Sequence, residues 1–471
     1  MFAAPRQQRQ IQWGIILIVM LIAGGIRLAR LPLVTMWSDE YHSFKISSLP
    51  LSEIIQGNYG RDYNPPLYFA LLHLQRRIFG DSEIAMRSPS LVFALITLPL
   101  FFFSARSILK AFIPSTAALV LMAFHPMLIY YSIEIRSYSL LVLFSVLSFL
   151  SCVMIHNGAK RQAVWLILLT LGLLGCLYTH YFGIIVPLSI IVFIGTKSLY
   201  FKRWSKSETL SLLGIGVAAL LYLPGILILR RQALTVPTGA VLTPLIQSLQ
   251  VFVASIAHPP YEQGLVYLAI LAFVSGLIVL FTQIRSTPAG LLVICGIATA
   301  VTFTLIASLN RIDIANRYLI PALPLVIIAI GATLTRRSGA WYRLINIVGV
   351  ITIAVYILYG TTFVLNTSRE NQQASWKADW KQFSEVVRKL RIDDEPLVVM
   401  GWDATPIQYY LGDASLSSFE LESQLPLRLH PSYLIIMTPN SRTIPILDSA
   451  TLLYEDKSEG LRILRLRVQS E

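Results

Sequence analysis

Charged residues are scarce in this chain of 471 residues, where they make up 13% of the sequence. A soluble domain carries about 25%. Apolar residues account for 55%, and many lie in runs of about 20 residues, the length at which a helix crosses a bilayer. The scarcity of charge therefore excludes a soluble globular protein and predicts a polytopic α-helical membrane protein.

Cysteine is also scarce, with three residues in the chain, each inside an apolar run. Cys152, Cys176 and Cys295 are too scattered for a zinc site, and the residues after 366 include no cysteine that could form a disulfide. We expect the three side chains to be small buried apolar groups.

Eleven apolar segments are long enough to predict membrane-spanning helices. Their ranges are 11–30, 84–104, 112–131, 138–155, 163–180, 183–200, 209–229, 264–282, 289–309, 318–335 and 344–366. We expect the first to be retained as a span, because its apolar core is too long for a signal peptide and no small-residue cleavage site is evident.

Acids are the scarcer charge, and residues 1–366 contain only ten of them. With the N-terminus in the cytoplasm, fourteen basic residues and one acid, Glu208, face inward, which follows the positive-inside rule. The other nine acids then lie on the outer side, and an odd number of spans exports the C-terminal segment. The sequence thus predicts an inner-membrane protein with its active face outside. This topology explains the net charge of +13 better than nucleic-acid binding does.

Two domains are expected, a membrane domain at residues 1–366 and an exported α/β domain at residues 367–471. The first outer loop, residues 31–83, is long. Within it, Leu49–Gly57 predicts a short interfacial helix, and Pro65–Phe79 predicts a helix along the membrane surface, because it is too short to cross comfortably.

The exported domain alternates helix and strand patterns. Trp376–Leu390 has helical periodicity, whereas residues 396–401, 433–437 and 461–468 have the patterns of strands. Since no Gly-rich phosphate loop, HExxH or GxSxG motif occurs here, we expect a lid or a partner-binding module rather than a second catalytic domain.

The first outer loop places Asp39 and Glu40 side by side. Such a pair has three alternatives: it holds a divalent cation, it acts as a general base, or it caps the N-terminus of a helix that begins at Ser38. Other polar residues fall on the same outer side, namely His42, Arg61, Asn64, Arg87, Glu134, Arg136, Tyr138, His180, Tyr181, Arg317 and Tyr318. Carboxylates beside several arginines suit an anionic substrate such as a lipid-linked phosphate.

Four motifs follow in order along this side: W-S-D-E at 37–40, N-P-P-L-Y-F at 64–69, R-S-P-S-L at 87–91 and S-I-E-I-R-S-Y at 132–138. Weaker matches are Y-T-H-Y-F-G at 178–183 and N-R-Y-L-I-P-A-L-P at 316–324. With these motifs the chain resembles the membrane C-type glycosyltransferases, in the branch of protein O-mannosyltransferases and aminoarabinose transferases of lipid A.

The resemblance implies transfer of one sugar from a polyprenyl-phosphate donor to a lipid, glycan or protein acceptor, with no nucleotide cofactor. It makes Asp39 the catalytic carboxylate and Glu40 part of the same motif, and a direct inverting displacement is expected. We expect the donor phosphate to contact Arg61, Arg87, Arg136 and Arg317, and the substrates to contact His42, Asn64, Glu134, Tyr138, His180, Tyr181 and Tyr318. A divalent metal at Asp39 and Glu40 stays open, because Tyr63-Asn64 stands where many relatives have His or Glu-Lys.

Structural alternatives and rival functions accompany these assignments. His180 could bond to the backbone, Arg317-Tyr318 could anchor at the interface, and Arg136 could pair with Glu134. A lipid or sugar transporter would need functional charges near mid-membrane or on both faces, whereas acids are almost absent from the span centres and from the inner face. A non-catalytic envelope assembly factor would tolerate loss of the Asp39 carboxylate.

Overall fold

The computed structural model describes residues 6–59, 63–233, 250, 253, 263–309, 315–335, 337–365, 380–391, 397–400, 406–412, 417–419, 432–437, 450–456 and 461–467. Two compact units make up the chain. Met1–Leu31 with Ser47–Phe363 forms the membrane unit, and Pro32–Ile46 with Val364–Glu471 forms the α/β unit.

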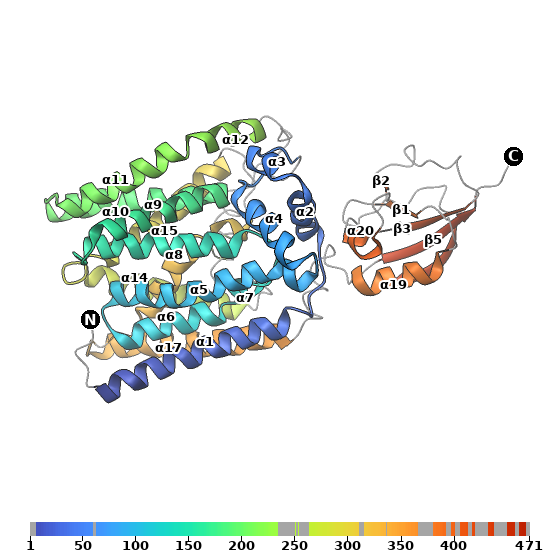
Figure 1. Ribbon diagram of the computed structural model, residues 1–471. Helices are drawn as coiled ribbons and strands as arrows, with labels where there is room; N and C mark the ends of the chain where they lie inside the picture. Colours follow the sequence, from blue (N-terminus) through green and yellow to red (C-terminus); the bar gives the residue numbers. More distant parts are fainter. Residues whose placement is uncertain are drawn as a thin grey trace. The chain divides into compact units, whose positions relative to one another are not determined.

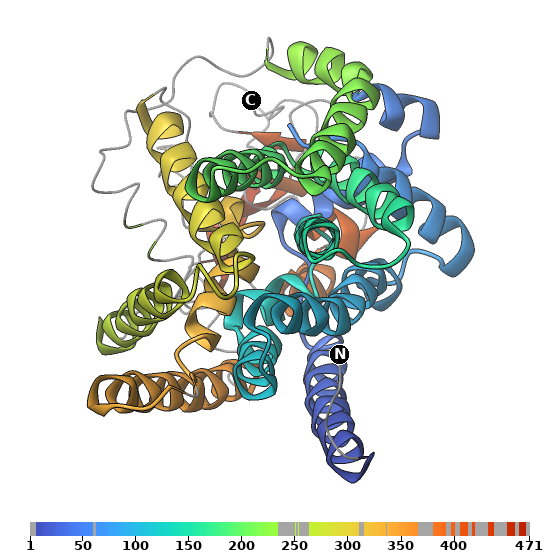
Figure 2. The same cartoon turned by 90° about the vertical axis from the view of Figure 1, so that its left-hand side faces the viewer.

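The membrane unit is a bundle of helices, as Figures 1 and 2 show. Its longer helices are α1 (Arg6–Arg30), α5 (Glu83–Leu109), α6 (Phe112–Phe124), α8 (Tyr138–His156), α9 (Gln162–Thr179), α10 (Ile185–Phe201), α11 (Lys206–Leu221), α14 (Gln263–Thr282), α15 (Gly290–Leu309) and α17 (Ala340–Leu365). Shorter elements are α3 (Leu51–Gln56), α4 (Leu67–Phe79), α7 (Pro126–Tyr131), α12 (Leu223–Ala233), α16 (Leu323–Gly331) and the 3₁₀ helices η1 (Tyr181–Ile184) and η2 (Asn316–Leu319). Helix α2 (Ser38–Ser48) begins in the α/β unit and ends in the membrane unit.

The predicted polytopic helical fold is confirmed, and each of the eleven predicted segments contains a helix. Among the described residues, seven helices are long and apolar enough to cross a membrane, or eight if α11 and α12, bent by 54°, form one span. The count of eleven crossings stays a prediction.

Proline divides three of the predicted segments. Pro126 starts α7 after His125 ends α6, Pro224 lies in the first turn of α12, and Pro324 lies in the first turn of α16. Because proline has no amide N–H to donate, it starts a helix more easily than it continues one. These breaks shorten helices where the sequence predicted single spans.

Small residues and bonded hydroxyls allow α8 and α9 to pack closely. A Cβ at Gly172 would come within 2.5 Å of the Ser148 hydroxyl. That hydroxyl donates instead to the carbonyl of Phe144 one turn earlier (2.8 Å), which satisfies it within an apolar bundle. The three cysteines are buried, as predicted.

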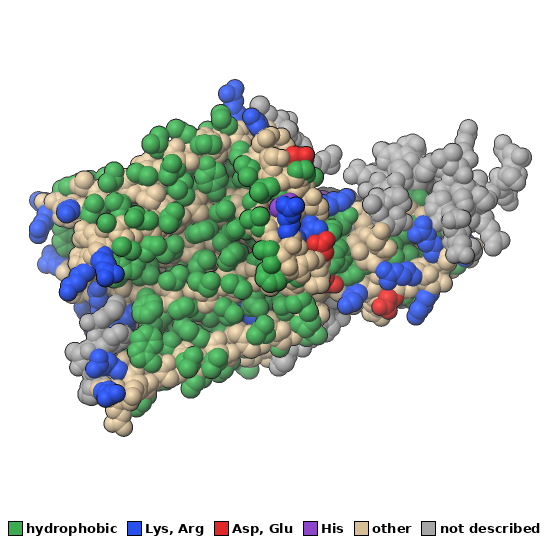
Figure 3. Space-filling model, viewed as in Figure 1, with side chains coloured by type: hydrophobic (Ala, Val, Ile, Leu, Met, Phe, Trp, Pro, Cys, Tyr) green, Lys and Arg blue, Asp and Glu red, His purple; other side chains and the backbone are tan. Residues whose placement is uncertain are grey.

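Lys and Arg side chains gather at the bundle end remote from α3 and α4 (Figure 3). We call this the basic end, and the end that carries α3, α4, α7 and η1 the loop end. Exposed members of the basic end include Lys160, Lys202, Arg203 and Lys206. The asymmetry predicted from the sequence is therefore present in the folded bundle.

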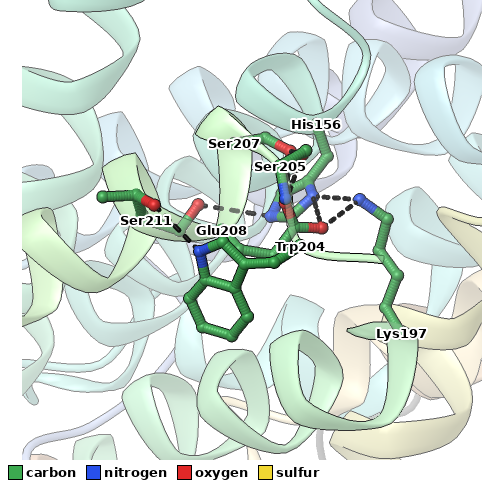
Figure 4. A network of polar contacts seen from close by, with 8 residues as sticks. His156, Lys197, Trp204, Ser205, Ser207, Glu208 and Ser211 are labelled. Carbon is green, nitrogen blue, oxygen red and sulfur yellow. Dashed lines mark hydrogen bonds and ion pairs between the residues drawn. The ribbon is translucent and has the colours of Figure 1, made fainter. Parts of the chain in front are cut away.

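Glu208, the acid that the sequence assigned to the basic side, is buried in a polar network (Figure 4). Its Oε1 lies 2.6 Å from Lys197 Nζ, which is 2.8 Å from His156 Nδ1. Its Oε2 accepts the amide N–H of Ser205 at 2.9 Å, completing a capping box at the start of α11. The network joins the ends of α8, α10 and α11.

The described residues of the α/β unit form a five-stranded sheet in the order β2-β1-β3-β5-β4. Its elements are α19 (Trp380–Leu390), β1 (Leu397–Met400), α20 (Pro406–Leu411), β2 (Ser417–Phe419), β3 (Ser432–Met437), β4 (Thr451–Asp456) and β5 (Leu461–Arg467). Strand β1 is parallel to β2 and β3, whereas β5 is antiparallel to β3 and β4. The predicted helix and three predicted strands are present, while α20, β2 and β4 were not predicted.

Candidate functional site

Glu40 is a buried cap rather than an open carboxylate. Helix α2 begins at Ser38, and Glu40 Oε2 accepts the amide N–H of Trp37 at 3.4 Å. Glu40 is the third residue of the helix and Trp37 is its N-cap, so this bond is the one that an acidic N3 side chain makes in a capping box. Glu40 is 0% exposed, whereas Asp39 is half-buried and His42 is exposed. Of the three sequence alternatives for the pair, capping therefore describes Glu40.

The described residues around Asp39 bear on the metal predicted at this pair. Glu40 is engaged by the backbone, and within the described ranges no three His, Cys, Asp or Glu side chains gather to hold an ion. A divalent cation at Asp39 and Glu40 stays a prediction from the sequence.

Arg87 is a fully buried arginine near the start of α5. Its Nη1 lies 2.9 Å from Glu83 Oε2, one turn earlier on the same helix, and Arg87 is 0% exposed. Since burying a charge is costly without a partner, Glu83 stabilises the guanidinium at the loop end.

Three of the sequence motifs meet at Ser90. Its hydroxyl donates to the carbonyl of Arg136 at 3.3 Å, and Tyr68 Oη lies 3.3 Å from the same hydroxyl. Tyr68 comes from N-P-P-L-Y-F, Ser90 from R-S-P-S-L and Arg136 from S-I-E-I-R-S-Y. The side chains of Glu134 and Arg136 are buried in the turn between α7 and α8. The motifs thus form one structural region.

Aromatic rings surround His180 at the loop end. Its ring centroid lies 5.8 Å from that of Tyr138 and 5.3 Å from that of Tyr318. The guanidinium of Arg317 lies 5.6 Å from the Tyr318 ring centroid, a cation–π distance. His180, Tyr138, Tyr318 and Arg317 therefore come together from three separate parts of the sequence.

The hydrogen bond of His180 to the backbone defines its tautomer. Nδ1 accepts the amide N–H of Phe182 at 3.1 Å and caps η1. The ring proton consequently resides on Nε2, so His180 presents a donor at that atom. The backbone alternative for His180 is confirmed.

The carbonyl of Asn64, directly before the two prolines, accepts two donors. They are the Tyr59 hydroxyl and Gln232 Nε2, the latter at 3.4 Å. The Tyr181 hydroxyl donates to Gln232 Oε1, which links η1, α12 and this loop. Gly57 allows α12 to approach this loop closely, because a Cβ at Gly57 would lie 2.6 Å from Ile228 of α12. Its φ of +73° is also a conformation that favours glycine.

Arg76 in α4 bonds to residues that precede and follow this helix in the sequence. It donates to the Ser47 and Ser48 hydroxyls at 3.0 and 2.6 Å. It also makes a two-point contact with the Asp81 carboxylate, at 2.7 Å for each bond. This guanidinium holds the pKa of Asp81 below its usual value.

Two arginines of α1 were not predicted as site residues from the sequence. Arg27 and Arg30 are buried, and Arg27 donates to the carbonyls of Ala23 and Ala123, each at 3.0 Å. Arg27 also lines a small pocket with Tyr131 and other residues. The signal was available, because an arginine within an apolar span is costly and often functional. Arg61, predicted as a phosphate contact, lies outside the described residues.

Comparison with known proteins agrees with this arrangement. Residues 63–228 match the family described as dolichyl-phosphate-mannose-protein mannosyltransferase. The fold is similar to ArnT from Cupriavidus metallidurans in the apo state, with a TM-score of 0.66, 13% identity, and coverage of 96% of this chain and 98% of that one. The chain therefore has the fold of this structure over nearly its whole length. No curated protein sequence matches it.

Two further solved structures have a similar fold. ArnT from the same organism bound to undecaprenyl phosphate gives a TM-score of 0.63 at 14% identity and covers 98% of both chains. The archaeal oligosaccharyltransferase AglB from Archaeoglobus fulgidus, in complex with an inhibitory peptide and a dolichol-phosphate, gives 0.53 at 12% identity. That match covers 86% of this chain and 64% of AglB. The chain is thus a multi-pass membrane protein with an ArnT-like fold.

Proposed function

We propose that this protein transfers one sugar from a polyprenyl-phosphate donor to a hydroxyl or amine of a lipid, glycan or protein acceptor. The observation that carries the proposal is the match of residues 63–228 to a mannosyltransferase family, within a fold similar to ArnT over 98% of the chain. The polyprenyl phosphates in similar structures support the same carrier class here.

Asp39 would act as the general base. It removes the proton of the acceptor hydroxyl or amine while that atom bonds to the anomeric carbon, and the bond from that carbon to the phosphate oxygen breaks. Polyprenyl phosphate leaves with the electron pair, and a single displacement inverts the anomeric centre. The assignment favours Asp39 over Glu40, because the Glu40 carboxylate is buried against the Trp37 amide.

The leaving phosphate would be stabilised by arginines of the loop end. Arg87 and Arg136 are buried, and Arg317 lies against Tyr318 in the aromatic group. A desolvated guanidinium forms strong, charge-assisted hydrogen bonds to phosphate oxygens. Arg61 is proposed for the same role from the sequence.

The remaining site residues would contact the sugar or the acceptor. His180 offers a donor at Nε2, and the rings of Tyr138 and Tyr318 beside it supply apolar faces for a sugar ring. The same substrate contacts are proposed for His42, Asn64, Glu134 and Tyr181. The site would lie on the extracytoplasmic side of the inner membrane.

The test is turnover of defined donors by protein in lipid nanodiscs. Polyprenyl-phosphate sugars are offered with membrane-extract acceptors, and release of free polyprenyl phosphate is followed by mass spectrometry. We expect Asp39→Asn to lower release by about 10²- to 10⁴-fold, the usual contribution of a general base. Glu53→Gln, which changes an exposed acid of α3, should keep wild-type turnover.

Each outcome separates the alternatives. Equal release by wild type and Asp39→Asn would show that Asp39 is not the base. No release by folded wild type with any donor would favour a transporter or an assembly factor. Loss of release with a chelator would establish the divalent cation.

A further inference from the structure

The α/β unit includes a segment from near the start of the chain. Pro32–Ile46, which follows α1, belongs to the same compact unit as Val364–Glu471. This segment carries Asp39, so the contacts that hold it bear on the proposed reaction.

Two hydrogen bonds join the segment to α20. Tyr410 Oη accepts the amide N–H of Met36 at 2.7 Å. The Tyr41 hydroxyl donates to Gln408 Oε1 at 2.6 Å. Met36 and Tyr41 lie on either side of Asp39 in the sequence, so the contacts bracket the first turn of α2.

An aromatic contact continues the same face. The ring of Tyr409 meets that of Phe44 edge-on, with centroids 5.2 Å apart. Phe44 in turn stacks on Tyr41 at 6.1 Å. Three consecutive residues of α20, from Gln408 to Tyr410, therefore contact successive parts of α2 and the residues before it.

These bonds are partly buried, with the more buried partner in the segment that carries Asp39. Met36 is 0% exposed and Tyr41 5%. Burial raises the pKa of Tyr41 to about 12, so its hydroxyl keeps the proton that it donates to Gln408. Removal of one partner leaves the other polar group without its hydrogen bond, which favours opening of the segment.

Helix α20 is itself anchored in the sheet core. Ile407 is fully buried beside Trp380, Phe383 and the strands. The Arg388 guanidinium of α19 donates to the carbonyl of Tyr410 at the far end of α20. The apolar core and the Arg388 hydrogen bond thus anchor the helix whose residues contact the Asp39 segment.

We propose that Gln408 and Tyr410 are positioning residues: through them the C-terminal domain holds the turn that carries Asp39 in its working conformation. This role rests on the proposed function. It assigns the C-terminal domain a part in the reaction, in which Gln408 and Tyr410 act through the segment that carries Asp39.

The test compares Tyr410→Phe, Gln408→Leu and Tyr41→Phe with the control Tyr454→Phe, which removes a hydroxyl from the same unit at a ring packed on Phe383. Hydrogen exchange of peptides within 32–46 reports the contact without any substrate. We expect exchange to be about fivefold to tenfold faster in Tyr410→Phe and Gln408→Leu than in wild type. In the control the exchange rate should equal that of wild type.

Turnover then tests the positioning. The variants should lower kcat about tenfold and leave KM for the polyprenyl donor unchanged, since only the base is displaced. The double variant Tyr41→Phe with Gln408→Leu should be no worse than the more affected single variant, because both break one bond.

Unchanged exchange would overturn the contact, and faster exchange with unchanged kcat would overturn the positioning role. An equal fall of kcat in Tyr454→Phe would do the same, since it would show general destabilisation. If wild type is inactive with every donor, the proposed function and the positioning role fail together. In that case the exchange result still decides whether α20 holds the segment.

Discussion

Single hydrogen bonds decide the chemical state of the side chains in the candidate site. Glu40 and His180 both bond to a backbone amide, so one is a cap and the other a defined tautomer. The sequence predicted both residues as site members. The resemblance also singled out Asp39 as the catalytic carboxylate, but no local pattern specified that Glu40 would be the acid that turns toward the Trp37 amide.

The tautomer of His180 gives a prediction at this scale. In His180→Asn the side-chain oxygen can still accept the Phe182 N–H, but the Nε2 donor is lost. We expect a melting temperature close to wild type and a kcat/KM about tenfold lower, the value of one hydrogen bond. His180→Ala should lower both quantities. Wild-type kcat/KM in His180→Asn would show that Nε2 contributes nothing to the reaction.

Helices and strands formed as predicted where the local sequence pattern and the surrounding lipid or core favour the same structure. Long apolar segments became helices because a backbone in lipid must satisfy its own hydrogen bonds. Helices α3 and α4 also lie where the sequence predicted them. By contrast, α20 and β2 are short and lack a clear period, so their formation depends on the sheet core around them.

The start of α11 gives the prediction at the element scale. Glu208→Gln removes the ion pair with Lys197 and weakens the capping box with Ser205. We expect a loss of stability of about 2–4 kcal/mol, which lies between the cost of a lost helix cap and the cost of a broken buried ion pair. The loss should appear as a lower thermal unfolding midpoint. Lys206→Gln, an exposed change in the same turn, is the control and should leave the midpoint unchanged. Equal midpoints for both variants would contradict a stabilising role of the network.

At the scale of the whole molecule, charge predicts orientation. Basic residues gather at one end of the bundle, which the positive-inside rule assigns to the cytoplasm (Figure 3). Ser52→Cys at the loop end and Lys160→Cys at the basic end are exposed probes, whereas the native cysteines are buried. In intact cells an impermeant maleimide should label Ser52→Cys only, and Lys160→Cys should react after lysis. The reverse pattern would invert the topology.

The sequence by itself determined the helical membrane fold, the charge asymmetry of the bundle and the α/β character of the tail. These follow from apolar length, charge and short-range periodicity, which act locally along the chain. The tertiary structure alone decided that three motifs meet at Ser90 and that Met36 bonds to Tyr410, 374 residues away. Such contacts depend on how distant elements pack, and no local pattern specifies that.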